Sequence, residues 1–423
     1  MSACIGQRAH LKGYHWALPR QLTFPPHLEQ LCRQCHRTIP VTRHRLIPAL
    51  RSVADEAVAV MEVTDAGGWD RKFGAIGPLS YGARAEQGPR ETMEDFVTVV
   101  PRGNCGFLYA GVFDGHQGPG AAAYLSEHLY EGIAGSLQQA ADSNSGTVGK
   151  LGRAVLDLVS RRNGQPQETP ELFYPSDLTK LLKDSFVLAD KEVLAFLHSQ
   201  EVREDQLAGC TATVLLVRQD KLAVANVGDS RAILSRGGAP VQVSTEHRVY
   251  GDGDIVQQEI DRVESTGGWI DDGRVCDILA VSRAFGDTEF KGEGLQGMLA
   301  HGVEDDMWTQ EFADSVHFTS DPVVALPDVT ELDRDEDDEF IVLATDGLWD
   351  VMSNKDVVQW GRKEFDKGRT AQQVADMLAT MALRKHTLDN VSVVVVDLGG
   401  GKQGWLPPDK RRGQNPFMNM FKG

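Results

Sequence analysis

Short apolar runs and longer amphipathic stretches divide residues 79–398 into predicted strands and helices. Runs rich in β-branched and aromatic residues predict strands at 96–100, 107–113, 211–217, 222–227, 232–234, 340–344 and 391–396. Several of these runs are apolar at every position, so we expect both faces of those strands to be covered. Apolar residues recur at helical spacing in 120–139, 176–198 and 371–384. The last of these helices is expected to open with a capping box formed by Thr370 and Gln373.

The order of these segments predicts an α+β fold. The strands come in hairpin-like pairs, such as 211–217 with 221–227 across Gln219 and Asp220, and do not alternate strictly with helices. This order favours packed antiparallel sheets over a doubly wound parallel sheet. Two turn-rich stretches, 140–170 and 291–320, interrupt the pattern and are expected to be insertions, the first of them a long loop.

Charge is distributed unevenly along the chain. The 423 residues carry a formal net charge of −18, which argues against nucleic acid as a partner, because phosphate backbones are bound by clusters of Lys and Arg. No apolar run approaches the roughly 18 residues that span a bilayer, so no transmembrane helix is expected. Residues 1–54 are rich in Arg and almost free of acids, a composition typical of an organelle transit peptide, with a disordered basic tail as the alternative. Residues 55–78 are interpreted as a linker and 399–423 as a basic C-terminal tail.

Acidic residues cluster with glycines at the ends of the predicted strands. The clusters are Glu94-Asp95, Asp114-Gly115-His116, Gly228-Asp229, Gly286-Asp287, Asp346 to Asp350 and Asp389-Asn390. A single Asp-Gly is first of all a turn signal, but a strand that ends in a carboxylate and then turns away can bring several carboxylates together. Hard divalent cations bind such oxygen ligands, and without a cation the carboxylates would repel one another. The pattern therefore predicts a centre for magnesium, manganese or calcium.

Two residues beside these clusters could take part in a reaction. His116, two residues after Asp114, could donate a proton near neutral pH. Arg90, four residues before Glu94, could hold a phosphate group with its planar fork of donors. Taken alone, each is more typical of a structural histidine and of a surface arginine. Their placement beside the carboxylate clusters favours the catalytic interpretation.

In their order along the chain, these motifs resemble those of the metal-dependent protein phosphatases of type 2C. The resemblance covers about residues 79–398, which we interpret as the catalytic domain. It is carried by Arg90-Glu-Thr-Met-Glu94-Asp95, Gly111-Val-Phe-Asp114-Gly115-His116, Gly209-Cys-Thr-Ala, Val227-Gly-Asp229-Ser230-Arg231, Ala280-Val-Ser-Arg-Ala-Phe-Gly-Asp287, Thr345-Asp346-Gly-Leu-Trp-Asp350 and Asp389-Asn390-Val-Ser-Val. The resemblance implies a four-layer α-β-β-α sandwich of two antiparallel sheets flanked by helices, with two Mg²⁺ or Mn²⁺ ions at one end of the sheets.

The resemblance also implies a role for each site residue. Asp114 would bridge the two cations, and the carbonyl oxygen of Gly115 would bind the first. The other implied metal residues are Glu94, Asp95, Asp346 and Asp389, and a weaker third cation is matched by Asp229 and Asp350 together with Asp346. Arg90 corresponds to the phosphate-binding arginine and His116 to the general acid, while residues 245–275 take the place of the flap beside the site.

The activity implied is hydrolysis of phosphoserine and phosphothreonine in proteins. Two cations would lower the pKa of a shared water, which would attack phosphorus in line, and His116 would protonate the leaving alkoxide. The route of the cysteine phosphatases is excluded by spacing, because none of the six cysteines has an arginine six positions later.

Within the family, the chain is similar to the branch that acts on light-harvesting antenna proteins at the chloroplast thylakoid. This similarity is carried by Gly267-Gly268-Trp269-Ile270, Arg274-Val-Cys and the stretch from Met298 through Trp308 to Phe312. It implies a monomer in the chloroplast stroma or at the thylakoid surface, with an antenna phosphoprotein as substrate. The C-terminal tail, with Lys410-Arg411-Arg412 and Phe417 to Phe421, suggests a peripheral membrane contact.

Other functions remain open at this point. The chain could be a non-catalytic scaffold with the phosphatase fold, although every ligand-type position is filled by an acid. It could also be a stromal or cytosolic type 2C phosphatase with another substrate. A calcium-binding module is a weaker alternative, because no loop of the EF-hand pattern occurs in the sequence.

Overall fold

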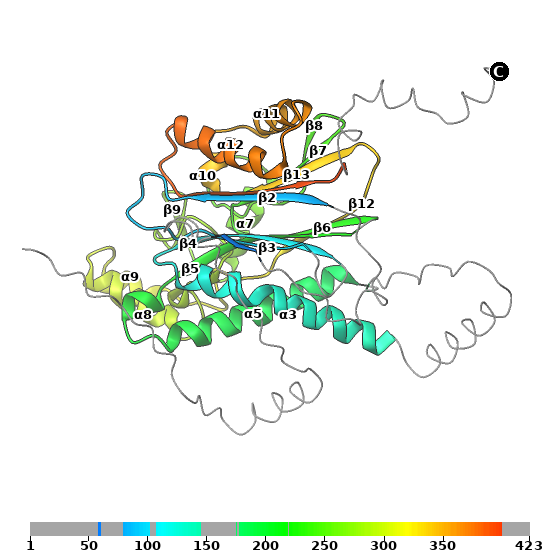
Figure 1. Cartoon of the computed structure of the whole chain (residues 1–423). Coiled ribbons are helices and arrows are strands. Elements are labelled where there is room, and N and C mark those ends of the chain that lie inside the picture. The colour runs from blue at the N-terminus through cyan, green and yellow to red at the C-terminus, as the bar shows by residue number, and fades with distance from the viewer. Residues whose placement is uncertain are drawn as a thin grey trace, which may run out of the picture. The chain divides into compact units, whose positions relative to one another are not determined.

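The strands form two stacked sheets (Figure 1). The computed structural model describes residues 58–60, 79–101, 107–144, 175, 177–218 and 220–399. The order in the first sheet is β1 (Val58–Val60), β3 (Phe96–Val100), β4 (Leu108–His116), β5 (Gly209–Val217), β6 (Lys221–Val227) and β12 (Asp328–Asp333), with β11 (Phe285–Gly286) paired to the start of β5. The order in the second is β2 (Ser80–Glu86), β14 (Val391–Asp397), β13 (Asp338–Ala344), β7 (Arg231–Arg236) and β8 (Ala239–Gln242). Neighbouring strands are antiparallel except for β1, which runs parallel to β3.

Helices cover the outer face of each sheet, which completes four layers (Figure 1). Helices α3 (Gly120–Asn144) and α5 (Leu178–His198) pack on the first sheet, and α11 (Asn354–Asp366) and α12 (Ala371–Arg384) pack on the second. The capping box of α12 is present, with Thr370 accepting from the backbone of Gln373. The predicted α+β sandwich is therefore confirmed.

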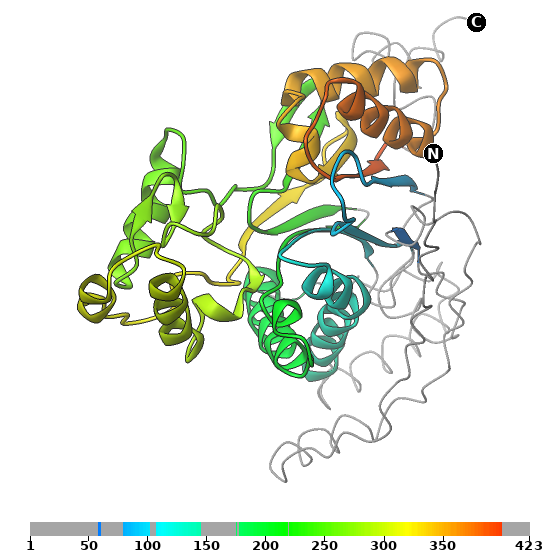
Figure 2. The same ribbon diagram turned by 90° about the vertical axis from the view of Figure 1, so that its left-hand side faces the viewer.

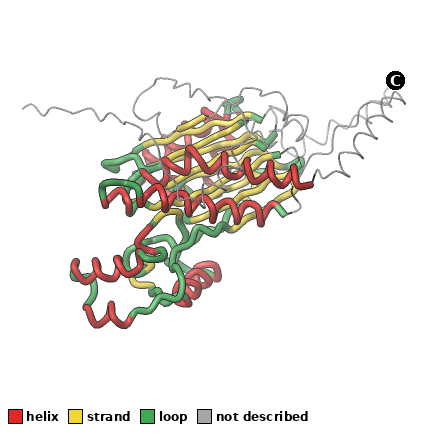
Figure 3. Tube along the Cα trace, turned by 90° about the horizontal axis from the view of Figure 1, so that it is seen from below, coloured by secondary structure: helices red, strands yellow, loops and turns green. Residues whose placement is uncertain are grey.

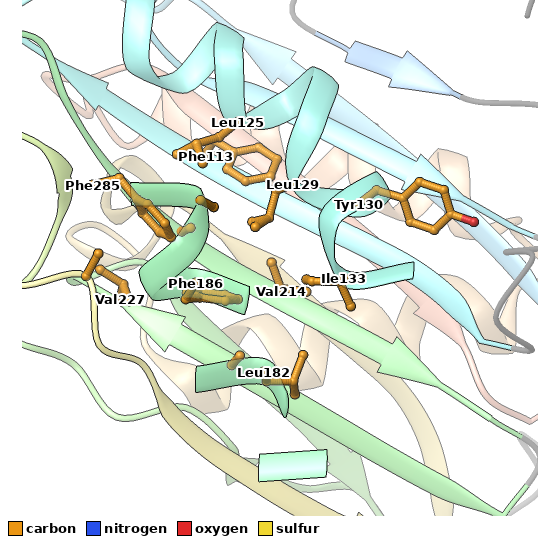
Figure 4. Packing of buried hydrophobic residues seen from close by; sticks show 14 of the residues in the cluster. Phe113, Leu125, Leu129, Tyr130, Ile133, Leu182, Phe186, Val214, Val227 and Phe285 are labelled. Carbon is orange, nitrogen blue, oxygen red and sulfur yellow. The ribbon is translucent and has the colours of Figure 1, made fainter. Parts of the chain in front are cut away.

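Three apolar clusters fill the spaces between the layers. Between the first sheet and its helices, Phe113 and Val214 meet Leu125, Leu129 and Phe186 (Figure 4). The cluster between the two sheets is formed by aliphatic residues from β3 to β6 of the first sheet and from β2, β7, β13 and β14 of the second. Because β13 and β14 have an apolar cluster on each face, all seven residues of each strand are buried. This explains why residues 340–344 and 393–396 of these strands are apolar without alternation.

A smaller helical part lies beside the sheets (Figures 2 and 3). It contains α7 (Asp254–Ser265), the hairpin of β9 (Ile270–Asp271) and β10 (Arg274–Val275), the 3₁₀ helix η2 (Thr288–Phe290), α8 (Gly294–Glu304) and α9 (Gln310–Ser315). Its apolar cluster joins residues of the predicted flap, such as Val263 and Val275, to residues of the predicted insertion, such as Met298. Trp269 of the flap packs edge-on against Trp308, with ring centroids 5.4 Å apart. The two segments thus form one folded unit, which the sequence did not show.

Several elements extend or add to the predicted pattern. Helix α3 continues to Asn144, so residues 140–144 of the predicted loop are helical; the breaker pair Ser145-Gly146 comes only afterwards. The rest of that loop, the leader 1–54 and residues 400–423 lie outside the described residues. Strand β1 lies inside the predicted linker. Strand β2 was not predicted from the sequence because it lacks β-branched residues, and its pairing with β14 makes it a strand. Two short helices, α6 (Arg203–Gln206) and α10 (Asp346–Trp349), complete the described elements. None of the described helices is long and apolar enough to cross a membrane.

Candidate active site

The predicted acids gather at one end of the two sheets because of how the strands pair. Asp114 lies near the end of β4, and Asp95 directly precedes its antiparallel partner β3. In the other sheet, Asp346 follows β13, and Asp389 lies two residues before its partner β14. Asp229 lies in the turn from β6 to β7, which connects the two sheets. Residues separated by more than 200 positions in the sequence are thereby placed at one edge.

Three carboxylates form the centre of this group. Asp114, Asp229 and Asp346 each offer an oxygen atom, and these oxygens lie within 4.8 Å of one another. Burial and neighbouring carboxylates raise the pKa of Asp114 well above its usual value and that of Asp346 to about 8. Burial also raises the pKa of Asp229, although Arg248 partly opposes this effect. Such shifts are expected when like charges are brought together without a cation.

Asp95 is buried next to the three central acids and binds the residue that precedes Asp346. Its side chain is 1% exposed, and its Oδ2 accepts a hydrogen bond of 2.9 Å from the hydroxyl of Thr345. Thr345 directly precedes Asp346 and also accepts a hydrogen bond from the backbone of Ser392. Burial raises the pKa of Asp95 to about 7, while the hydrogen bond from Thr345 lowers it. The buried carboxyl of Asp95, just before β3 of the first sheet, is thus bonded to Thr345, just after β13 of the second sheet.

Glu94 lies at the rim and outside the central three. Its carboxylate accepts hydrogen bonds from the hydroxyl of Thr92 at 2.8 Å and from the backbone of Gly118 at 3.4 Å. The side chain of Asn390 fixes this loop, because it accepts from the backbone N–H of Glu94 and donates to Gln87 and Thr92. Gly115 is required at its position, since a Cβ atom there would lie 2.5 Å from the carbonyl oxygen of Glu94.

Arg90 forms an ion pair with one of the predicted metal ligands. Its Nη2 lies 2.6 Å from Oδ2 of Asp389, and its Nε donates to the carbonyl of Leu388 at 3.2 Å. The arginine side chain is 56% exposed, so its remaining donors face solvent beside the acids. The structure therefore places Arg90 at the entrance of the site, with Asp389 as its partner.

His116 contacts a residue whose role the sequence did not suggest. Its Nε2 lies 2.8 Å from Oδ1 of Asp287, which follows β11. Burial lowers the pKa of His116, but the charge and hydrogen bond of Asp287 outweigh burial, so that the net pKa is raised. A histidine held in its protonated form can donate a proton to a leaving group. The sequence signal for Asp287 was its Gly286-Asp287 motif, which gave no indication of this partner.

Arg248 is a second site residue that the sequence did not single out. Its guanidinium lies 3.6 Å from Asp229 and 3.9 Å from Asp350, whose side chain is 59% exposed. Asp350 is outside the central three acids and lies on the solvent side of Arg248. No metal-binding pattern in the sequence points to an arginine at this place.

The donors at this end of the sheets fit hard divalent cations. All three central ligands are carboxylate oxygens, the type that Mg²⁺ and Mn²⁺ prefer. Burial and mutual repulsion raise the pKa values of Asp114 and Asp346, and a bound cation would favour their ionised forms. Among the described residues this is the one group of acids, cysteines and histidines that meets the geometry of a metal site.

Solved structures of other proteins share this fold. A serine-threonine phosphatase 2C from Toxoplasma gondii superposes with a TM-score of 0.55 at 19% identity and covers 77% of this chain and 97% of its own. A structure described as a C. elegans sex determining protein has a TM-score of 0.51 at 22% identity and covers 79% of this chain and 67% of its own. At these identities the structures support the sandwich fold alone.

Sequence comparison identifies the family. Protein phosphatase 2C 57 of Arabidopsis thaliana is 35% identical over 336 residues, which are 79% of each chain. Probable protein phosphatase 2C 68 of Oryza sativa subsp. japonica is 30% identical over 343 residues, which are 76% of this chain and 78% of the relative. The family model described as protein phosphatase 2C matches residues 79–391, a range that contains every site residue named above. The chain therefore belongs to the protein phosphatase 2C family and is a protein-serine/threonine phosphatase.

Proposed function

We propose that the chain hydrolyses phosphoserine and phosphothreonine with two Mg²⁺ or Mn²⁺ ions at the acid centre, and that a third cation binds more weakly beside them. The observation that supports this proposal is the convergence of Asp114, Asp229 and Asp346 within 4.8 Å. Asp114 and Asp346 would hold the two ions, with the carbonyl of Gly115 and the acids Glu94, Asp95 and Asp389 as further ligands, directly or through water. When bound, such cations lower the pKa of water and neutralise negative charge on a phosphoryl group.

The side chains around the centre supply the remaining chemistry. Arg90 faces solvent at the entrance, so its free donors can bind the phosphate of a substrate while Nη2 stays on Asp389. Asp287 stabilises the imidazolium of His116, which carries a proton on each ring nitrogen; Nε2–H faces Asp287, so Nδ1–H is the proton that His116 can transfer to the leaving serine or threonine oxygen. Cys210, which pairs with Gly115 across β4 and β5, is buried and its thiol pKa is raised well above the usual value, which argues against this cysteine as a nucleophile.

The experiment for this activity is the substitution Asp114→Asn in the full chain. We expect loss of Mn²⁺-dependent phosphate release from a phosphothreonine peptide and weaker Mn²⁺ binding by calorimetry. Asp184→Asn is the matched control, because Asp184 is exposed on α5 and pairs with Lys180 far from the acids. Retained activity in Asp114→Asn, together with unchanged Mn²⁺ binding, would contradict the metal mechanism.

We further propose that the enzyme is a chloroplast protein that dephosphorylates antenna proteins at the thylakoid surface and acts as a monomer. Support comes from the Arg-rich, acid-poor residues 1–54 and from the stretches 267–276 and 298–312, which resemble the thylakoid branch of the family. The acidic body, residues 55–398 with a net charge of −29, favours phosphosites with basic neighbours through long-range attraction.

Import into isolated chloroplasts tests the location. The radiolabelled full chain should become shorter and resist external protease, whereas a chain lacking residues 1–54 should stay outside. If the full chain remains unprocessed and protease-sensitive, the proposed location is wrong. Salt washing of the thylakoids and deletion of residues 399–423 then test the peripheral membrane contact. Phosphoproteomics of a null mutant tests the substrate, and persistent phosphorylation of proteins other than the antenna would redirect the proposal.

A further inference from the structure

Arg248 is held in place beside the acid centre by its neighbours in the chain. The preceding residue, His247, is fully buried; its Nδ1 accepts a hydrogen bond from the backbone of Gly228, and its Nε2 lies 3.3 Å from Asp328. Arg248 itself forms an isolated β-bridge with Val281. The backbone that carries Arg248 is thus attached to the turn that carries Asp229, and its side chain is directed to the acids.

The guanidinium of Arg248 contacts acids electrostatically without being fixed by hydrogen bonds. Its Nε lies 3.6 Å from Asp229 Oδ2, and its Nη2 lies 3.7 Å from Glu246 and 3.9 Å from Asp350. These distances are too long for hydrogen bonds. Both Nε and Nη2 are buried and have no hydrogen-bond partner among the described residues. Movement of the guanidinium would therefore break no hydrogen bond at Nε or Nη2, because neither atom makes one.

We propose that Arg248 is a built-in counter-ion for Asp229 and Asp350, which competes with a divalent cation for this acid pair and so keeps the third cation position weak. The inference rests on the proposed metal-dependent function, in which Asp229 and Asp350 serve the third cation. A guanidinium is charged at every relevant pH, so its positive charge opposes a second cation at the same acids. The third ion can bind fully only when the guanidinium moves away from Asp229.

Glu246 and Tyr250 could hold the guanidinium of Arg248 after it leaves Asp229. Glu246 lies within 3.7 Å of Nη2 and is already paired with Arg231 at 2.7 Å. The guanidinium also lies over the ring of Tyr250, 5.2 Å from its centroid. A displaced guanidinium keeps an acid and an aromatic ring as partners, which limits the free energy lost when it leaves Asp229. Competition between two positions is thus possible without unfolding the flap.

Titration of the full chain with Mn²⁺, followed by calorimetry and by electron paramagnetic resonance of free Mn²⁺, tests this inference. We expect Arg248→Gln to bind the weakest ion about tenfold more tightly than the natural chain, because a repulsive unit charge has been removed nearby. Arg236→Gln is the matched control: it removes the same charge at the other end of β7, where Arg236 pairs with Asp338. This control should bind Mn²⁺ like the natural chain.

Each outcome separates the inference from the proposed function. An unchanged or weaker third site in Arg248→Gln would overturn the role of Arg248, while two tight ions in both chains would leave the metal-dependent function intact. Absence of stoichiometric Mn²⁺ binding in every chain would instead refute the proposed function. The gain in Arg248→Gln should disappear when Asp229→Asn is added; a gain that persists would place the extra ion elsewhere and also overturn the inference. If Arg248→Gln does not fold, Arg248→Met also removes the charge, keeps a long unbranched side chain, and must give the same result.

Discussion

Nε2 of His116 and Oδ1 of Asp287 lie 2.8 Å apart across a strand that separates them. His116 ends β4 and pairs with Gly209 of β5, while Gly209 pairs on its other side with Gly286, the residue before Asp287. A Cβ atom at position 209 would lie 2.1 Å from His116 Nε2 and 2.3 Å from Asp287 Oδ1. His116 and Asp287 can therefore approach each other only because residue 209 is a glycine, whose position leaves room for both side chains.

Asp287→Asn should change stability in a pH-dependent way in the metal-free protein. Asp287 raises the pKa of His116, so its contribution is fully present below the unfolded histidine pKa of about 6.5 and is lost as pH rises through the folded value. We expect the variant to be about 1 to 2 kcal/mol less stable near pH 6 and nearly equal to the natural chain near pH 9. Urea unfolding in EDTA at both pH values measures this difference. A difference independent of pH would show that the charge on His116 is not involved.

Removal of divalent cations should make the protein less stable as pH rises. The pKa values of Asp95 and Asp346 are raised to about 7 and about 8, so the folded state resists ionisation that the unfolded chain undergoes near pH 4. With EDTA, the melting temperature should fall between about pH 5 and about pH 8, and excess Mn²⁺ should largely abolish this fall. Asp346→Asn should show a shallower fall in EDTA. A melting temperature that is flat with pH without cations would contradict the pKa shifts.

Gly115→Ala should displace the loop that carries Glu94. The added Cβ would lie 2.5 Å from the carbonyl oxygen of Glu94, and backbone cannot yield as a flexible side chain can. We expect a loss of about 1 to 3 kcal/mol in stability together with weaker Mn²⁺ binding. Gly120→Ala is the control, because its Cβ would meet only side-chain atoms at 3.7 Å or more. Equal melting temperatures for the two variants would argue against the tight approach.

Lys291→Met should destabilise the segment around β11, the strand that directly precedes Asp287. The Lys291 Nζ lies 2.8 Å from both oxygens of Asp190 and donates to the carbonyl of Ala284, and Asp190 also accepts from the backbone of Gly286. Loss of the Lys291 ammonium group leaves the buried carboxylate of Asp190 without its charged partner, which costs about 3 to 5 kcal/mol. Denaturant unfolding measures this loss. The double variant Asp190→Asn, Lys291→Met should recover part of it, and no recovery would show that the two side chains act independently.

The sequence by itself predicted strands β3 to β7, β13 and β14, helices α3, α5 and α12, and most of the acids at the site. Strands β13 and β14 could be predicted because burial on both faces favours the continuous apolar runs 340–344 and 393–396. Asp114 and Asp346 could be predicted as site residues because each follows an apolar run, 107–113 and 340–344, and a carboxylate at the end of a buried strand is a suitable metal ligand. The acids at strand ends were predicted to come together, and oxygens of Asp114, Asp229 and Asp346 lie within 4.8 Å of one another.

Only the tertiary structure decided which groups meet across the chain. His116 and Asp287 are 171 residues apart, and their contact depends on β11 pairing with the first residues of β5, a two-residue strand without a sequence pattern. Arg248 lies in an irregular segment, so no periodicity aims it at Asp229. Strand β2 lacks β-branched residues and becomes a strand through its ladder with β14. In each case the stabilising interaction involves residues distant in sequence, and local composition does not contain it.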